Sequence, residues 1–296
     1  MKEYHLGLIG YPLSHSLSPI IHQGFLKSCG LAGHYDLFPI QDDQSKEEKL
    51  QEIIQRIRSA ELDGLNVTIP HKQNVITFLD GVTGDARIVG AVNTIYRKEG
   101  KIFGDNTDVS GFLADIERLI ALEERGTAVV LGAGGAARAV TLGLIKKGWN
   151  VIITARRKEQ AQQIVEQLAP LATHDVKWVN IFIQSLLFTE LESFISERVN
   201  LISLIVNCTP IGMAGYPPID LIPKTVQLNK NIKVYDLVYN PPETSLLKMA
   251  RQLGLEGLNG MGMLIEQAAR SFEIWTGVTL PRPLRISISP MIEETS

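Results

Sequence analysis

The sequence predicts an α/β protein with two domains, each built on a largely parallel sheet. Strand and helix patterns alternate along nearly the whole chain, and the alternation is stricter in the second half. A hairpin signal, the polar run 97–100 between two apolar segments, closes the first half. The 296 residues give room for two domains of ordinary size.

The first half predicts a mixed, mostly parallel sheet. Alternating apolar segments indicate its strands, and apolar residues at helical spacing indicate its helices. Ser18 and Pro19 are predicted as the N-cap and the first residue of the first helix. The expected strands are 6–10, 35–40, 65–69, 91–96 and 101–103, and the expected helices are 18–27 and 45–60.

The second half has the order of a doubly wound nucleotide-binding domain. Short apolar strands alternate with helices, and two further helices close the chain. The expected strands are 127–131, 151–154, 178–182, 202–207 and 233–237, and the expected helices are 135–147, 159–168, 244–253 and 262–275.

Composition excludes several classes of protein. A formal net charge of -3 gives no reason to expect nucleic acid as a partner. Two cysteines make no disulfide framework, and residues 1–10 do not resemble a secretory signal. The apolar stretch 176–206 is interrupted by charges, so it predicts buried strands around a helix rather than a membrane span. A cytoplasmic location is therefore expected.

A glycine-rich turn is the strongest local signal. Residues Gly132, Ala133, Gly134, Gly135 and Ala136 follow an apolar strand directly and open a helix. Glycine lets the backbone approach a pyrophosphate, whose charge the amides at the helix N-terminus can meet. This context favours a Rossmann-like dinucleotide site over a plain strand-to-helix turn.

The end of the next strand favours NADP as the cofactor. An Asp or Glu usually stands there to bind a free ribose 2′-hydroxyl. Here Arg156, Arg157 and Lys158 follow, with no acid before Glu159. Cations suit a 2′-phosphate, and arginine can bind it bidentately. A solvated basic helix start is the alternative.

Polar residues in the first half form a second candidate site. Each one alone has an ordinary explanation as a cap, a turn former or a solvated side chain. As an ordered set with the glycine turn, they resemble the motifs of shikimate dehydrogenases over nearly the whole chain. The matching segments are PLSHSLSP (12–19), NVTIPHK (66–72), GAVNT (90–94), NTD (106–108), GAGGA (132–136), NCTPIGM (207–213), YDLVYNP (235–241) and GMGMLIEQ (260–267).

The resemblance implies a substrate-binding domain of residues 1–107 plus 261–296, a dinucleotide-binding domain of residues 108–260, and a cleft between them. It also implies reversible NADP-dependent reduction of 3-dehydroshikimate to shikimate, a step of aromatic amino acid biosynthesis. The implied substrate-binding residues are Ser16, Ser18, Thr68, Lys72, Asn93, Asp108, Tyr239 and Gln267. The implied cofactor-binding residues are Gly132, Ala133, Gly134, Gly135, Ala136, Arg156, Arg157, Leu237 and Gly260.

The resemblance implies that Lys72 and Asp108 are the catalytic pair. When an alcohol loses a hydride from carbon, the proton of its hydroxyl must be transferred as well. Lys72 is assigned as the acid/base and Asp108 as its orienting partner. His71 is a rival, but it would point to the other side of an extended segment. The histidines and cysteines show no zinc-ligand spacing, so no metal is expected.

Two alternatives stay open. One is a quinate/shikimate dehydrogenase with relaxed NAD or NADP use, because Ala155-Arg156-Arg157 departs from the more common Asn-Arg-Thr. The other is a sensor of the same fold that binds ligand without turnover. A small-molecule substrate is the expected partner, without nucleic acid or membrane, and a homodimer is left open.

Overall fold

The computed structural model describes residues 2–174, 181–216, 219–223 and 225–284. The chain divides into two compact units. Unit 1 comprises Met1–Thr107 and Ile265–Ser296, and unit 2 comprises Asp108–Leu264.

Unit 1 is built on a six-stranded mixed sheet, with the order β2-β1-β3-β5-β6-β4. β1 pairs in parallel with β2 and β3, whereas β5 runs antiparallel to β3 and β6. The predicted mixed, mostly parallel sheet is therefore confirmed. The strands are β1 (Glu3–Gly10), β2 (Ala32–Pro39), β3 (Gly64–Val67), β4 (Gly81–Val82), β5 (Thr94–Lys98) and β6 (Lys101–Asp105).

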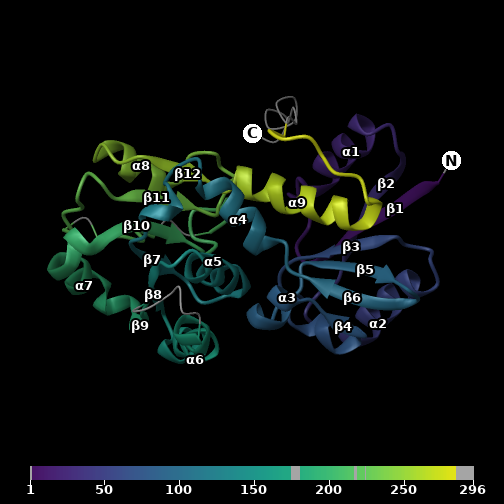
Figure 1. The fold of residues 1–296 in the computed structure, drawn as a ribbon, viewed down its shortest axis with the longest axis horizontal. Coiled ribbons are helices and arrows are strands. Elements are labelled where there is room, and N and C mark those ends of the chain that lie inside the picture. Colours follow the sequence, from purple (N-terminus) through teal and green to yellow (C-terminus); the bar gives the residue numbers. More distant parts are fainter. Residues whose placement is uncertain (1, 175–180, 217–218, 224, 285–296) are drawn as a thin grey trace. The chain divides into compact units, whose positions relative to one another are not determined.

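Helices cover both faces of this sheet (Figure 1). On one face, rings from α1 and α9 gather around Tyr35 of β2 and close to Gly64 of β3. On the other face, α2 buries Leu50, Ile53 and Ile57, and each buried side chain contributes about 1.5–3 kcal/mol. The helices are α1 (Ser18–Ser28), α2 (Lys46–Arg58), α3 (Gly84–Val89), the short 3₁₀ helix η1 (Asn74–Phe78), and α9 (Met261–Thr276), which belongs to unit 1 from Ile265 onward.

The start of α1 differs from the prediction. Leu17, rather than Ser18, occupies the N-cap position, and Oγ of the preceding Ser16 accepts from the amide of Ser18 at 3.3 Å. Ser18 is the first helical residue, and only 8% of its surface is exposed. Burial raises the pKa of the nearby Tyr35 hydroxyl, and the side chain of Ser18 opposes that rise.

Unit 2 is built on an all-parallel six-stranded sheet, with the order β12-β11-β10-β7-β8-β9. The order steps outward from β7 in both directions, which confirms the Rossmann-like, doubly wound prediction. The strands are β7 (Thr127–Leu131), β8 (Asn150–Ala155), β9 (Ile183–Leu187), β10 (Ile202–Asn207), β11 (Lys233–Asp236) and β12 (Gly257–Asn259). The helices are α4 (Asp108–Ile116), α5 (Gly135–Lys146), α6 (Lys158–His174), α7 (Leu191–Arg198) and α8 (Ser245–Gln252), with 3₁₀ turns at Leu122–Glu124, Phe188–Glu190 and Val199–Leu201.

The strand expected at 178–182 is placed differently. Residues 178–180 lie outside the described part of the chain, and β9 begins at Ile183. The rest of the apolar stretch forms β9, α7 and β10, so the prediction of strands around a helix is correct for the described part.

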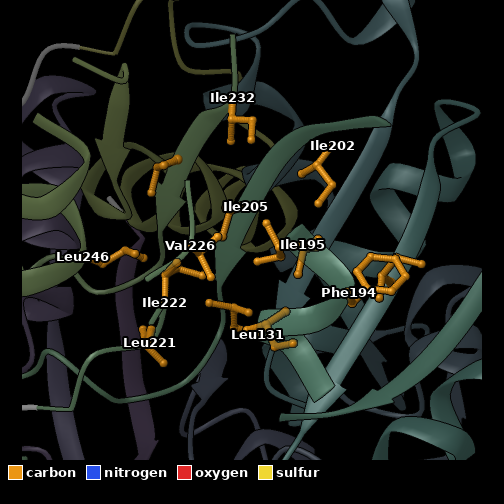
Figure 2. Close-up of a cluster of buried hydrophobic side chains, with 14 of the residues drawn as sticks. Leu131, Phe194, Ile195, Ile202, Ile205, Leu221, Ile222, Val226, Ile232 and Leu246 are labelled. Atoms are coloured by element: carbon orange, nitrogen blue, oxygen red, sulfur yellow. The ribbon is translucent and has the colours of Figure 1, made fainter. Parts of the chain in front are cut away.

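The core of unit 2 accounts for this apolar stretch. Figure 2 shows Phe194 and Ile195 of α7 beside Ile202 and Ile205 of β10 and Leu131 of β7. A second group from the segment before β11 packs on the same cluster: Leu221, Ile222, Val226 and Ile232. The stretch is hydrophobic because its residues form part of the parallel sheet of unit 2 and cover one face of it. In the described part of the chain, the helices are too short or too polar to cross a bilayer.

Candidate active site

Five predicted substrate residues lie at one edge of the unit 1 sheet, the edge that the carboxyl ends of β1 and β3 form. β1 and β3 run in parallel, so the segments that follow them emerge at the same edge. β5 runs antiparallel to β3, so its first residue starts from that edge as well. The residues brought there are Ser16, Ser18, Thr68, Lys72 and Asn93.

Backbone hydrogen bonds tie the two loops at this edge together. The amide of Tyr11 donates to the carbonyl of Ile69 at 2.9 Å, and the amide of Thr68 donates to the carbonyl of Ile9 at 2.8 Å. At Gly10, a Cβ atom would lie 2.3 Å from Cγ2 of Thr68, a distance that no side chain tolerates. Glycine is therefore required where the loop after β1 passes the loop after β3.

Asn93 and Gln267 come together although they are far apart in the sequence. Nδ2 of Asn93 donates to Oε1 of Gln267 at 3.3 Å and to Oγ1 of Thr107 at 2.9 Å. Oδ1 of Asn93 accepts from the amide of Thr107 at 2.8 Å. Asn93 is buried and Gln267 is half-buried on α9. The structure thus fixes an amide pair at the edge where the serines and Thr68 lie.

A buried network that the sequence did not reveal supports this pair. Nδ2 of Asn66 donates to the carbonyl oxygen of Asn93 and to Oγ of Ser271, both at 3.0 Å, and Oδ1 of Asn66 accepts from the Tyr35 hydroxyl at 2.8 Å. Oγ of Ser271 also lies 2.7 Å from Oγ1 of Thr94. A polar residue inside the apolar strand β3 was the available signal, because buried polar groups need partners.

Lys72 and Asp108 belong to different units, because the boundary of the two units falls between Thr107 and Asp108. Lys72 is half-buried beyond β3, and its carbonyl accepts from the amide of Val92 at 2.7 Å. Asp108 begins α4 and is 6% exposed. A carboxylate in the first turn of a helix is stabilised by the helix dipole. The pairing of these two residues stays a prediction.

His71 is engaged elsewhere. It is fully buried, and its Nε2 lies 2.6 Å from the carbonyl oxygen of Ile40. Since a carbonyl oxygen only accepts, that nitrogen carries the hydrogen. This structural bond makes His71 a poor acid/base and favours Lys72.

In unit 2, the glycine turn has the backbone geometry that a pyrophosphate site needs. Gly132 has φ +111°, a conformation that favours glycine, and its amide donates to the carbonyl of Thr154 at 2.7 Å. Gly134 is the N-cap of α5, and open space surrounds the position where its Cβ would stand. The first turn of α5 holds no acidic residue, so its amides can receive an anion.

Two cations follow the neighbouring strand. β8 ends at Ala155 and is hydrogen-bonded to the glycine turn through Thr154. Arg156 and Arg157 come next, and both are exposed. In doubly wound domains, residues at this position contact the ribose of the cofactor or its 2′-phosphate.

The remaining strands of unit 2 end in a second polar network. Nδ2 of Asn207 donates to Oδ1 of Asp236 at 2.8 Å, and Oδ2 of Asp236 accepts from the Thr244 hydroxyl at 2.6 Å. Burial raises the pKa of Asp236, and these hydrogen bonds oppose the rise. The amide of Leu237 donates to the carbonyl of Asn207 at 3.0 Å.

Gly260 and Tyr239, two further predicted residues, lie close to this network in the sequence. A Cβ atom on Gly260 would lie 2.1 Å from the carbonyl oxygen of Leu237, so glycine is needed for the backbone approach. Tyr239 is half-buried, and burial raises its pKa. The asparagine and aspartate beneath them were not among the predicted site residues.

The sequence of this chain is similar to the sequences of known proteins. Residues 8–95 match the family model of the shikimate dehydrogenase substrate binding domain, and residues 260–284 match that of the shikimate 5′-dehydrogenase C-terminal domain. The shikimate dehydrogenase (NADP⁺) of Methanocaldococcus jannaschii is 40% identical over 279 residues, which are 94% of this chain and 93% of that protein. The chain belongs to the shikimate dehydrogenase family.

Solved structures of the shikimate dehydrogenase family agree with this membership. The Thermus thermophilus shikimate 5-dehydrogenase in complex with NADP(H) and shikimate is 31% identical, with a TM-score of 0.76, covering 94% of this chain and 95% of that one. The Corynebacterium glutamicum quinate dehydrogenase in complex with NAD is also 31% identical, with a TM-score of 0.81 and coverages of 94% and 95%. The solved structures similar to this chain thus include a shikimate dehydrogenase bound to NADP(H) and a quinate dehydrogenase bound to NAD.

Proposed function

We propose that this chain catalyses the reversible, NADP-dependent reduction of 3-dehydroshikimate to shikimate. The Asn93–Gln267 pair is the observation that carries the proposal. Each side-chain amide carries both a donor and an acceptor, and the hydrogen bonds of Asn93 to Gln267 and Thr107 hold the pair in position. Such a pair suits a ring bearing several hydroxyls, since a hydroxyl also donates and accepts.

The residues of unit 2 fit NADP as the cofactor. Gly134 leaves open space over the start of α5, where the pyrophosphate would be received by backbone amides. Arg156 and Arg157 would hold the 2′-phosphate, and Leu237 and Gly260 would line the cofactor from the neighbouring strand ends. When bound, NADP supplies the hydride acceptor or donor.

The predicted substrate residues would bind and deprotonate the substrate. Ser16 and Ser18 donate hydroxyl hydrogens to the carboxylate, while Thr68, Asn93 and Gln267 bond the ring hydroxyls, with Tyr239 as a further contact. In the direction of oxidation, Nζ of Lys72 takes the proton of the reacting hydroxyl as its carbon loses a hydride, and Asp108 orients that amine. In the reverse direction, Nζ returns the proton to the carbonyl oxygen.

The test is an absorbance assay of nicotinamide reduction with shikimate and quinate, each with NADP⁺ and NAD⁺. The expected result is rapid NADPH formation with shikimate, and a much lower kcat/KM in the other three combinations. Saturable shikimate binding without any reduction would indicate the ligand sensor and overturn the proposal.

A quinate/shikimate dehydrogenase with relaxed cofactor use is the second candidate. The similarity to a quinate dehydrogenase bound to NAD favours it, as does the Ala155-Arg156-Arg157 strand end. Comparable kcat/KM values for both acids or both cofactors would establish this candidate. A cytoplasmic location and a homodimer stay predictions, to be measured by cell fractionation and by size-exclusion chromatography with light scattering.

A further inference from the structure

A histidine pair lies at the amino ends of β1 and β2, at the opposite edge of the unit 1 sheet from the candidate substrate residues. His5 and His34 are direct register partners in this parallel strand pair. Their ring centroids are 4.4 Å apart, and both rings are half-buried. Partners in register project from the same face of a sheet, so the two imidazoles share one patch of surface.

A carboxylate completes the group. Glu3 precedes His5 by two positions on β1, and strand residues two apart project from the same face. One ligand atom from each of Glu3, His5 and His34 can be chosen so that all lie within 4.8 Å of one another. We propose that these three residues form a site for a borderline transition-metal dication, with Zn²⁺ as the expected occupant.

The donor set selects this class of metal. Two imidazoles and one carboxylate suit zinc and its neighbours, whereas calcium and magnesium prefer oxygen ligands alone. Ligands at ~2.0–2.2 Å from a tetrahedral zinc stand roughly 3.3 Å apart, so modest side-chain rotations would close the group around the ion. Three protein ligands leave the fourth position to water.

Asp36 supplies a second observation that favours a metal. Its Oδ2 lies 3.2 Å from Nε2 of His34, and it projects from the same face of β2. If Nε2 carries the hydrogen and faces this carboxylate, the lone pair of the neutral ring is on Nδ1, where it can bind a metal. Metal-binding histidines commonly have a carboxylate behind the ring in this way.

Lys2, which precedes Glu3 in the sequence, is directed to other partners. Nζ of Lys2 lies 2.7 Å from Oδ1 of Asp63 and 4.3 Å from the centroid of the Tyr4 ring. Lys2 and Tyr4 alternate with Glu3 and His5 along the chain, so they project from the opposite face. The carboxylates of Glu3 and Asp36 therefore project from the face that carries the two imidazoles, and Lys2 does not.

A bound ion would bridge β1 to β2, the edge strand of the sheet. The histidines meet only through the register of the folded strands, so the ion would bind the folded chain much more tightly than the unfolded one. Such an ion raises the melting temperature. The same fact explains why spacing along the sequence indicated no metal.

The test is a calorimetric titration of the full chain with Zn²⁺ after treatment with a chelator. One ion is expected to bind per chain, and zinc should raise the melting temperature. His5→Ala and His34→Ala should each lower the affinity at least about tenfold, and Asp36→Asn should lower it by a smaller factor. His15→Ala, which alters an exposed histidine in the loop after β1, should bind as the wild type does.

Glu3→Gln separates loss of zinc binding from loss of folding, because it changes one exposed side chain at a strand end. It should melt like the wild type in chelator and still bind zinc less tightly. The proposal is overturned if the wild type does not bind zinc more tightly than millimolar, or if zinc affinity is unchanged in both histidine variants and in Glu3→Gln.

Discussion

The carboxyl edges of the two sheets are built in different ways. In unit 1, the edge carries buried side chains that bond one another, with Asn93 joined to Thr107 and Gln267 and supported by Asn66. In unit 2, the edge beside β7 presents backbone, with a glycine turn, open space at Gly134 and exposed arginines after β8. The edge of unit 1 is a network of fixed side chains, whereas the part of the unit 2 edge formed by the glycine turn and the end of β8 is an open loop with exposed arginines at its side.

The difference matches what each edge is proposed to bind. A ring with several hydroxyls needs directional donors and acceptors that are held in place, because an unpaired buried polar group costs about 1–3 kcal/mol. A pyrophosphate is satisfied by amides at a helix N-terminus, and a further phosphate by cations that reach it from the surface. Substitutions in unit 1 should therefore change chemistry and stability together, whereas substitution of the arginines should change cofactor affinity alone.

The largest effect is expected for Lys72→Ala. Loss of a general acid/base lowers the rate about 10²–10⁴-fold, so kcat for shikimate oxidation should fall by that factor. Binding of shikimate, measured by calorimetry, should persist, since serine, threonine and amide side chains remain. Lys101→Ala removes an exposed lysine of the β5–β6 hairpin and should leave kcat unchanged. Unchanged turnover of Lys72→Ala would remove this residue from the mechanism.

One buried group in each unit should make the free energy of unfolding depend on pH, and the two dependences should have opposite signs. In unit 1, His22 of α1 is stacked on Tyr35 with centroids 4.3 Å apart, and burial lowers its pKa from 6.5 to about 3. The unfolded chain therefore binds more protons than the folded one between these values, and the free energy of unfolding falls as the pH falls. At pH 4 this loss is about 3 kcal/mol.

In His22→Phe this loss should disappear, which urea unfolding at pH 7 and pH 4 measures. In unit 2, the raised pKa of Asp236 gives the opposite sign, because the folded chain binds more protons and its contribution to stability falls as the pH rises above 3.8. Asp236→Asn should therefore lose more stability on acidification than the wild type does. An equal fall in the wild type and His22→Phe would show that His22 does not cause the acid sensitivity.

Asn93→Ala should weaken both stability and substrate binding. It removes the acceptor of the buried Thr107 amide and the donor to Gln267, so the free energy of unfolding should fall by about 2 kcal/mol. The KM for shikimate should rise in the same variant. Asn231→Ala, at an exposed asparagine, should change neither quantity. A change in KM without a change in unfolding would mean that the network is not part of the stability of unit 1.

The elements with strong periodicity could be predicted from the sequence, and the short ones could not. The strand before the glycine turn was found at its observed bounds, 127–131, because the apolar residues 128–131 directly precede the glycines. β12, with three residues including Gly257 and Asn259, carries no apolar run, so it was missed. The helix Asp108–Ile116 was also missed, although the predicted dinucleotide-binding domain begins at that aspartate.

The residues of the candidate site also differ in how well the sequence predicts them. The glycine turn is local, so strand, turn and helix identify it together. The support of Asn93 is not local, because Asn66 and Ser271 are 205 positions apart and meet only when α9 packs on the sheet. Gln267 was recognised only through a motif, since one polar residue on an amphipathic helix has no signal of its own. The pairing of Lys72 with Asp108 stays a prediction.

The smallest effect is expected at the arginines, and it tests the open character of the second edge. Arg156→Ala and Arg157→Ala each remove an exposed cation after β8, and no hydrogen bond or ion pair is described for either side chain. A charge-assisted hydrogen bond contributes about 1.5–3 kcal/mol, and exposure to solvent brings this toward the lower end, so the KM for NADP⁺ should rise roughly tenfold. The KM for NAD⁺, which lacks the 2′-phosphate, should stay the same, as should the free energy of unfolding. Arg97→Ala, at an exposed arginine of β5, is the matched control. An equal rise in KM for both cofactors would mean that these cations attract the pyrophosphate in general, and the preference for NADP⁺ would then need another origin.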